Sequence, residues 1–126
     1  MSIALVLVLG GAGGLGSVAR FVLDGVIRSR VRTSTPVGTI TINVTGSLLL
    51  GFLTGLVLAA ALPPTWTLVV GTGFLGGYTT FSTASHETVR LLRSGSVRAA
   101  LASGVGTAVA ALIAAGVGLW LGLLIA

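Results

Sequence analysis

A run of residues that disfavours helix interrupts what must be the third membrane-spanning segment of this chain. The run is 76–83, with the sequence GGYTTFST, between the apolar stretch 68–75 and the helix-favouring stretch 84–92. Two adjacent glycines followed by β-branched, aromatic and hydroxylated residues make a poor helix interior. Because unpaired backbone groups are costly in hydrocarbon, such a break is tolerated only where it is buried in protein, lines an aqueous path or coordinates an ion. The pattern predicts ion handling rather than a passive anchor.

The composition is that of a membrane protein. Of 126 residues, 54% are apolar and only 7% are charged, whereas soluble domains are about a quarter charged. The absence of cysteine excludes disulfides, thiolate metal sites and thiol catalysis. All seven basic residues are arginines, mostly at the ends of apolar segments, where they indicate topology rather than nucleic-acid binding.

Four apolar segments are each long enough to cross a bilayer, which takes about 20 residues. We place them at 3–27, 37–62, 65–93 and 97–125. Their connections are too short to hold a soluble domain. The sequence thus predicts an all-α membrane protein with a single four-span domain over residues 1–126 and a third helix broken near residues 76–83. The first segment begins without a basic n-region, so we expect no cleaved signal peptide.

Glycines recur at the four-residue spacing that lets membrane helices approach closely. The pairs are Gly10/Gly14, Gly51/Gly55, Gly73/Gly77 and Gly118/Gly122. Several such faces predict close packing within the chain and association with another subunit. Because four helices enclose little interior space, we expect an ion path to require an oligomer.

The arginines predict an orientation in the membrane. Three arginines lie between the first and second spans, three flank the connection between the third and fourth, and the opposite side, with both termini and Pro63-Pro64, carries no charged residue. The positive-inside rule therefore places both arginine-bearing connections in the cytoplasm and both termini outside.

Several motif matches carry no function. The glycines of 11–16 fit G-x-G-x-x-G, but no acidic residue follows at the required distance and no parallel sheet is predicted. The sequon at Asn43 lies within a span, so no glycan can be attached there. His86-Glu87 lacks the second histidine of a zinc-protease motif, and no nucleophile motif is present. We expect no enzymatic activity.

Polar side chains inside the spans are the candidates for function. Thr39, Asn43 and Ser47 form one stripe on the second span, and Ser103 and Thr107 form a shorter one on the fourth. Such residues either hydrogen-bond between helices or line an ion path.

Two charged residues in the first span can likewise be interpreted as functional or as structural. Arg20 lies deep in the span, and its charge is either functional or paired with Asp24 on the same helix face.

The candidate pathway residues are neutral or cationic. They are Thr39, Asn43, Ser47, Phe81, Ser82, Ser103, Thr107 and Arg20. Hydroxyl and amide donors can replace the hydration shell of an anion, and the edge of a phenylalanine ring carries positive potential. Carbonyls freed at the break suit a hard monovalent cation. Composition and spacing do not name the ions.

Three stretches of the chain resemble the Fluc/CrcB fluoride channel family. They are Gly10–Arg20 (GGAGGLGSVAR), Pro36–Gly51 (PVGTITINVTGSLLLG) and Gly71–Glu87 (GTGFLGGYTTFSTASHE). The resemblance implies a fluoride-selective channel that exports fluoride across the plasma membrane and relieves its toxicity. It also implies an antiparallel dimer with two fluoride pathways and a structural sodium ion at the dimer interface.

The resemblance assigns roles to particular residues. It implies that Asn43 and Phe81 line the fluoride path and that Arg20 lies at a vestibule. The implied further polar contributors are Thr39, Ser103, Thr107 and Glu87. The carbonyls of Gly76 and Thr79 are implied to hold the sodium ion.

One departure from the family pattern bears on the partner. The usual T-T-F-S-T-F ends here in Ala84, so the second pathway phenylalanine is missing, and Tyr78 replaces a usual aliphatic residue. The chain is therefore expected to form either a homodimer or, given its strong arginine bias, an antiparallel heterodimer with a paralogous subunit that keeps this phenylalanine. The alternatives are a four-span drug/proton antiporter of dual topology and a non-conducting partner subunit.

Overall fold

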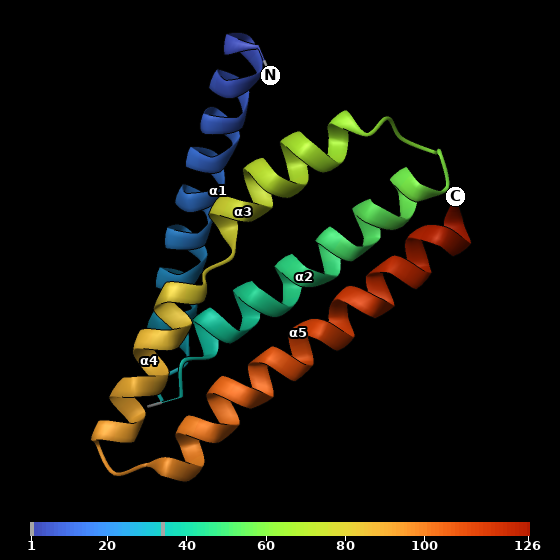
Figure 1. Cartoon of the computed structure of the whole chain (residues 1–126). Coiled ribbons are helices and arrows are strands. Elements are labelled where there is room, and N and C mark those ends of the chain that lie inside the picture. The colour runs from blue at the N-terminus through green and yellow to red at the C-terminus, as the bar shows by residue number, and fades with distance from the viewer. Residues whose placement is uncertain (1, 34) are drawn as a thin grey trace.

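The computed structural model describes residues 2–33 and 35–126, which form helices and no strand (Figure 1). The elements are α1 (Ile3–Arg30), α2 (Val37–Leu58), the π-helix η1 (Thr67–Leu75), α3 (Gly76–Tyr78), α4 (Phe81–Arg93) and α5 (Val97–Ile125). The predicted all-α fold with a broken third helix is confirmed. The α1–α2 and α4–α5 connections, which carry the arginines, lie at the same end of the molecule (Figure 1).

Helices α2 and α5 lie side by side along most of their length (Figure 1). Two of the predicted glycine pairs make this contact. A Cβ added at Gly51 would lie 2.0 Å from the Ala115 carbonyl oxygen, and one at Gly118 would lie 2.1 Å from the Leu48 carbonyl oxygen. A Cβ added at the second glycine of each pair would lie 2.6 Å (Gly55) or 2.3 Å (Gly122) from a backbone oxygen of the facing helix. The two backbones thus touch directly, as small-residue faces allow.

Helix α1 packs against the first half of the broken span, η1 and α3. A Cβ at Gly77 would lie 2.1 Å from the Gly13 carbonyl oxygen, and one at Gly16 would lie 2.0 Å from the Phe74 carbonyl oxygen. Gly77 therefore packs as predicted. The pair Gly10/Gly14 does not, because nothing lies within 4 Å of the Cβ position at either glycine. This pair therefore takes no part in packing within the chain, and its expected part in association with another subunit stays a prediction.

The third span differs in detail from the prediction. Its apolar half is a π-helix, a rare form that is frequent at functional sites. The non-helical part is only Thr79 and Thr80, both extended, because Gly76–Tyr78 continue as α3 and Phe81 begins α4. Helix α2 also ends at Leu58 rather than at residue 62, and Ala60 in the following turn has a φ of 61°.

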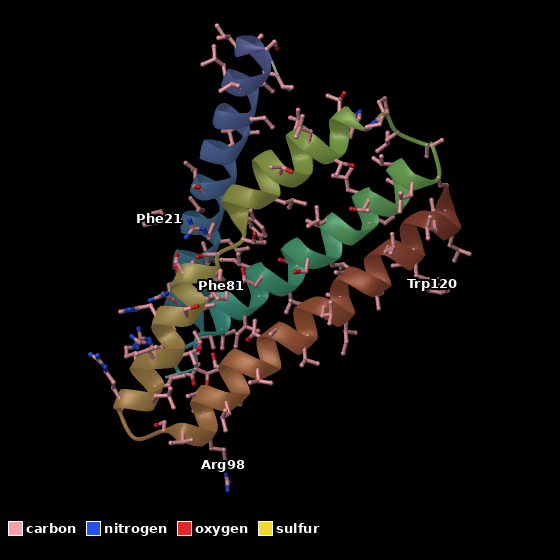
Figure 2. The ribbon with its side chains drawn as sticks, viewed as in Figure 1. Phe21, Phe81, Arg98 and Trp120 are labelled. Atoms are coloured by element: carbon pink, nitrogen blue, oxygen red, sulfur yellow. The ribbon has the colours of Figure 1, made fainter. Side chains whose placement is uncertain are left out.

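The outer surface is apolar. Phe21 is 80% exposed and Trp120 is 61% exposed, and both side chains point away from the helices (Figure 2). Helices α1, α2 and α5 are long and apolar enough to cross a membrane, whereas the third span is divided into shorter helices. Exposed apolar faces of this extent are typical of helices that face lipid or another subunit. The chain is a multi-pass membrane protein.

Candidate functional site

The side chain of Asn43 replaces the helical partners that Thr80 loses at the break. The Asn43 Nδ2 donates to the Thr80 carbonyl at 2.8 Å, and the Thr80 N–H donates to the Asn43 Oδ1 at 2.8 Å. In a continuous helix this N–H would bond to the Gly76 carbonyl. A single amide on α2 thus satisfies both backbone groups of the residue at the break, and the Thr80 hydroxyl caps α4 by accepting from the Thr83 N–H at 3.1 Å.

Helix α1 supplies hydrogen-bond donors to another backbone group near the break, the carbonyl of Gly77. The Gly77 carbonyl accepts from Arg20 Nε at 3.2 Å and from Ser17 Oγ at 3.4 Å. The positive charge of Arg20 therefore lies against the carbonyl end of α3, where a cation is favoured. The alternative pairing of Arg20 with Asp24 is wrong, because Asp24 Oδ2 accepts from Arg28 Nε at 3.0 Å instead.

Two carbonyls at the break are left for another partner. The Gly76 carbonyl loses its usual donor because the Thr80 N–H bonds to Asn43. The Thr79 carbonyl accepts no hydrogen bond from the residues that the structure describes. Both residues line the same cavity. The arrangement offers two carbonyl oxygens, which are the ligand type that a hard cation prefers.

This cavity lies beside the break between α2, α4 and α5 and has a volume of about 790 Å³. It brings together the predicted residues Asn43, Ser47, Phe81, Ser103 and Thr107. The residues Ser103 and Thr107 are buried, but their side-chain hydroxyls make no hydrogen bond to any residue that the structure describes. Their hydroxyls are therefore free to bind a ligand in the cavity.

The aromatic wall of the cavity is incomplete. Phe81 stands at the rim and is 87% exposed in the single chain (Figure 2). Ala84, one turn along α4 from Phe81, lines the cavity with only a methyl group. The resemblance to the family implied a second phenylalanine ring at this position. Ser82 is exposed and does not line the cavity.

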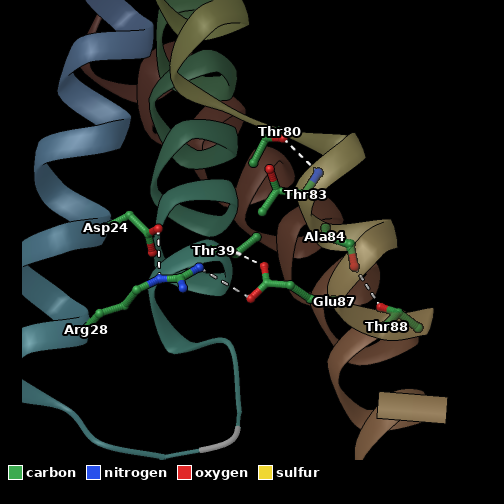
Figure 3. A network of polar contacts seen from close by, with 8 residues as sticks. All are labelled: Asp24, Arg28, Thr39, Thr80, Thr83, Ala84, Glu87 and Thr88. Atoms are coloured by element: carbon green, nitrogen blue, oxygen red, sulfur yellow. Dashed lines mark hydrogen bonds and ion pairs between the residues drawn. The ribbon is translucent and has the colours of Figure 1, made fainter. Parts of the chain in front are cut away.

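Thr39 and Glu87 lie outside the cavity, one helical turn from residues that line it. The Thr39 hydroxyl donates to Glu87 Oε1 at 2.5 Å, and Arg28 Nη2 lies 3.7 Å from Glu87 Oε2 (Figure 3). Glu87 and Arg28 line a second, polar space of about 60 Å³ at the α1–α2 connection. The contact with Arg28 was not predicted, because the two residues are far apart in the sequence.

The fold and this site define a class: a membrane protein with a broken span whose freed backbone is satisfied by polar side chains, beside a largely apolar cavity that exposes a few hydroxyl and amide groups. The family model described as "CrcB-like protein, Camphor Resistance (CrcB)" matches residues 5–119. The chain belongs to this family.

Curated relatives are similar over most of their length. The chain is 60% identical to fluoride-specific ion channel FluC 1 of Leifsonia xyli subsp. xyli, over 97% of this chain and 89% of the relative. It is 49% identical to FluC 2 of Cutibacterium acnes, over 88% of this chain and 91% of the relative. It is 48% identical to FluC 2 of Mycobacterium tuberculosis, over 86% and 83%.

The Asn43 contacts predict a stability role that can be measured. Asn43→Ala leaves the Thr80 N–H and carbonyl without partners, which should cost about 1–3 kcal/mol for each group. Asn43→Asp should also destabilise, because its carboxylate accepts from the N–H but repels the carbonyl. Thermal unfolding in detergent measures both. Ser47→Ala, one turn along the same helix, should unfold at the wild-type temperature; equal stability of all three variants would contradict the role.

Proposed function

We propose that this chain is a subunit of a fluoride-selective channel that carries fluoride out of the cell across the plasma membrane and thereby relieves fluoride toxicity. The observation that carries the proposal is the cavity lined by the buried residues Ser103 and Thr107, whose hydroxyls have no protein partner in the described structure. The family membership and the printed names of the relatives agree with this function.

The cavity suits a small anion. Asn43 uses one N–H on Thr80 and keeps a second, and hydroxyl groups donate one hydrogen bond each. Phe81 can offer a positive ring edge from the rim. These few donors replace the hydration shell of a dehydrated ion, so a narrow path lined by them favours fluoride over the larger chloride. Permeation needs no catalytic group.

Removing one cavity hydroxyl should reduce flux without loss of stability. Thr107→Val and Ser103→Ala should each slow fluoride efflux from liposomes about tenfold or more, since a hydrogen bond to a charged group contributes about 1.5–3 kcal/mol. Thr54→Val is the matched control, because Thr54 does not line the cavity and its hydroxyl donates to the Leu50 carbonyl of its own helix. Efflux from all three variants at the wild-type rate would contradict the proposed path.

We also propose a structural sodium ion, held by the carbonyls of Gly76 and Thr79. The support is that both carbonyls lack their usual donors, and that Gly76 is exposed in the single chain, where the same carbonyls of a second chain can approach. Carbonyls near the membrane midplane are suitable ligands for sodium.

Sodium binding predicts a cation-dependent stability. Replacing sodium by N-methylglucamine should lower the unfolding temperature of the purified protein, because a ligand that binds only the folded state stabilises it. Thr79→Ser keeps the carbonyl and should preserve this difference, whereas Gly76→Val should reduce it by crowding the site. An unfolding temperature that is the same in both salts would contradict the sodium site.

The proposed assembly is an antiparallel dimer in the membrane. A homodimer would lack the ring at Ala84 in both pathways, and the arginine bias opposes insertion in both directions. We therefore favour a heterodimer with an oppositely oriented paralogue, with both termini of this chain outside. Ala84 also favours the second candidate function, a non-conducting subunit, if this chain is reconstituted alone.

The orientation can be measured with single cysteines, since the chain has none of its own. Ser2→Cys and Ser94→Cys are at exposed positions on opposite ends of the spans. An impermeant thiol reagent should label position 2 from outside and position 94 only from the cytoplasm. Comparable labelling of each position from both faces would show dual insertion and overturn the heterodimer argument.

A further inference from the structure

The polar space at the α1–α2 connection is bounded by charged groups from different helices. Asp24 and Arg28 come from α1, and Glu87 and Arg90 come from α4. The two carboxylates and two guanidinium groups balance, so the formal charge of this space is zero. Glu87 is the buried member, because its side chain is only 6% exposed whereas that of Arg28 is 59% exposed.

Arg28 is the link between the two carboxylates. Its Nε lies 3.0 Å from Asp24 Oδ2 and its Nη2 lies 3.7 Å from Glu87 Oε2, so one planar guanidinium bridges α1 and α4 (Figure 3). The rigid fork of arginine fits such a bridge better than the point charge of lysine. Arg30 makes no ion pair with any residue that the structure describes.

Asp24 is itself fixed by α2. Its Oδ1 is buried without a hydrogen-bond partner in the described structure, and a Cβ added at Gly38 would lie 2.0 Å from this oxygen. A side chain at position 38 would displace the carboxylate from this place. The contacts therefore follow one another as a chain of contacts. Asp24 packs against Gly38 and pairs with Arg28. Arg28 in turn lies near Glu87, which accepts a hydrogen bond from Thr39.

This chain of contacts ends next to the large cavity. Thr39 is one turn from Asn43 on α2, and Glu87 is one turn from Ala84 on α4; Asn43 and Ala84 both line the cavity. An anion that moves from the cavity along α2 and α4 toward the α1–α2 connection would meet Glu87, which lines the space at that connection. Without a compensating charge, the buried Glu87 carboxylate would repel it.

We propose that Arg28 is a positioning residue for anion passage, which holds and neutralises Glu87 at this end of the path and is itself oriented by Asp24 against Gly38. The proposal rests on the proposed channel function. It concerns how readily the anion gains access to the path rather than the maximal rate of transport or the stability of the fold.

The test measures fluoride efflux from liposomes over a range of internal fluoride concentrations. Arg28→Gln should raise the half-saturating concentration about fivefold, the effect of one unit charge at about 4 Å in a water-like dielectric. The maximal rate and the unfolding temperature should change little, because the Arg28 side chain is exposed, its Nη2 is 3.7 Å from Glu87 Oε2, and Glu87 keeps its hydrogen bond from Thr39. Arg28→Lys should restore most of the affinity. Gly38→Ala should raise the half-saturating concentration while it removes no charge.

Two matched controls separate the effect of the Arg28 ion pairs from the effect of losing a charge or adding a methyl group. Arg30→Gln removes one positive charge from the same end of α1, so it weakens the positive-inside signal for orientation as much as Arg28→Gln does. It breaks no described ion pair. Gly25→Ala adds the same methyl group as Gly38→Ala at a position with nothing within 4 Å. Both controls should keep the wild-type half-saturating concentration.

The outcomes separate the two proposals. If the wild-type chain, alone or with an oppositely oriented paralogue, passes no fluoride, the channel function fails and the role of Arg28 with it. If the wild type conducts and Arg28→Gln behaves as Arg30→Gln, only the role of Arg28 is overturned. A fall in maximal rate and unfolding temperature at unchanged half-saturation would make Arg28 a structural tie and would also overturn it.

Discussion

The rest of the structure depends on the paired hydrogen bonds between Asn43 and the backbone of Thr80. A break within a bilayer is stable only if protein groups replace the lost helical partners. Asparagine can do so because its amide has both donors and acceptors, like the peptide group itself. The contact also requires α2 to approach the break closely: a Cβ at Gly46 would lie 2.4 Å from the Thr79 methyl group. The glycine and the asparagine on α2 thus act together to hold the third span open.

This arrangement gives Asn43 a structural role at the break and leaves it one N–H group for the proposed role in the ion path. The amide has two N–H groups and an oxygen with two lone pairs, and Thr80 occupies one N–H and one acceptor position. The remaining N–H is what an anion in the cavity can use. A change at Asn43 therefore alters the break and the proposed path together. Ser103 and Thr107 do not share this ambiguity, because no described residue depends on their hydroxyls.

The sequence predicted what depends on local pattern. Hydropathy placed the spans, and poor helix formers placed the break. The partners across the break could not be predicted, because Asn43 and Thr80 are 37 residues apart and Arg20 and Gly77 are 57 residues apart. The pairing of Asp24 was ambiguous, since arginines lie four residues to either side. An acidic residue that precedes its cation on a helix is the better arrangement, and this rule favours Arg28, as observed. No pattern signalled the π-helical turn of η1.

The need to satisfy polar backbone groups within a bilayer explains the contacts of Asn43, and it is also the physical reason for proposing a second chain. The cavity exposes Gly76, whose carbonyl has lost its usual donor, together with Phe81, which is 87% exposed. Lipid offers no hydrogen bonds to carbonyls or hydroxyls, so the polar groups that this largely apolar cavity of about 790 Å³ exposes are satisfied in a membrane only by protein, water or ions. The glycines at positions 10 and 14 have nothing packed against them within the chain. A partner that covers the cavity would supply the missing wall beside Ala84 and keep lipid away from the freed carbonyls, so the break that requires Asn43 within the chain also supports the proposal of a partner outside it.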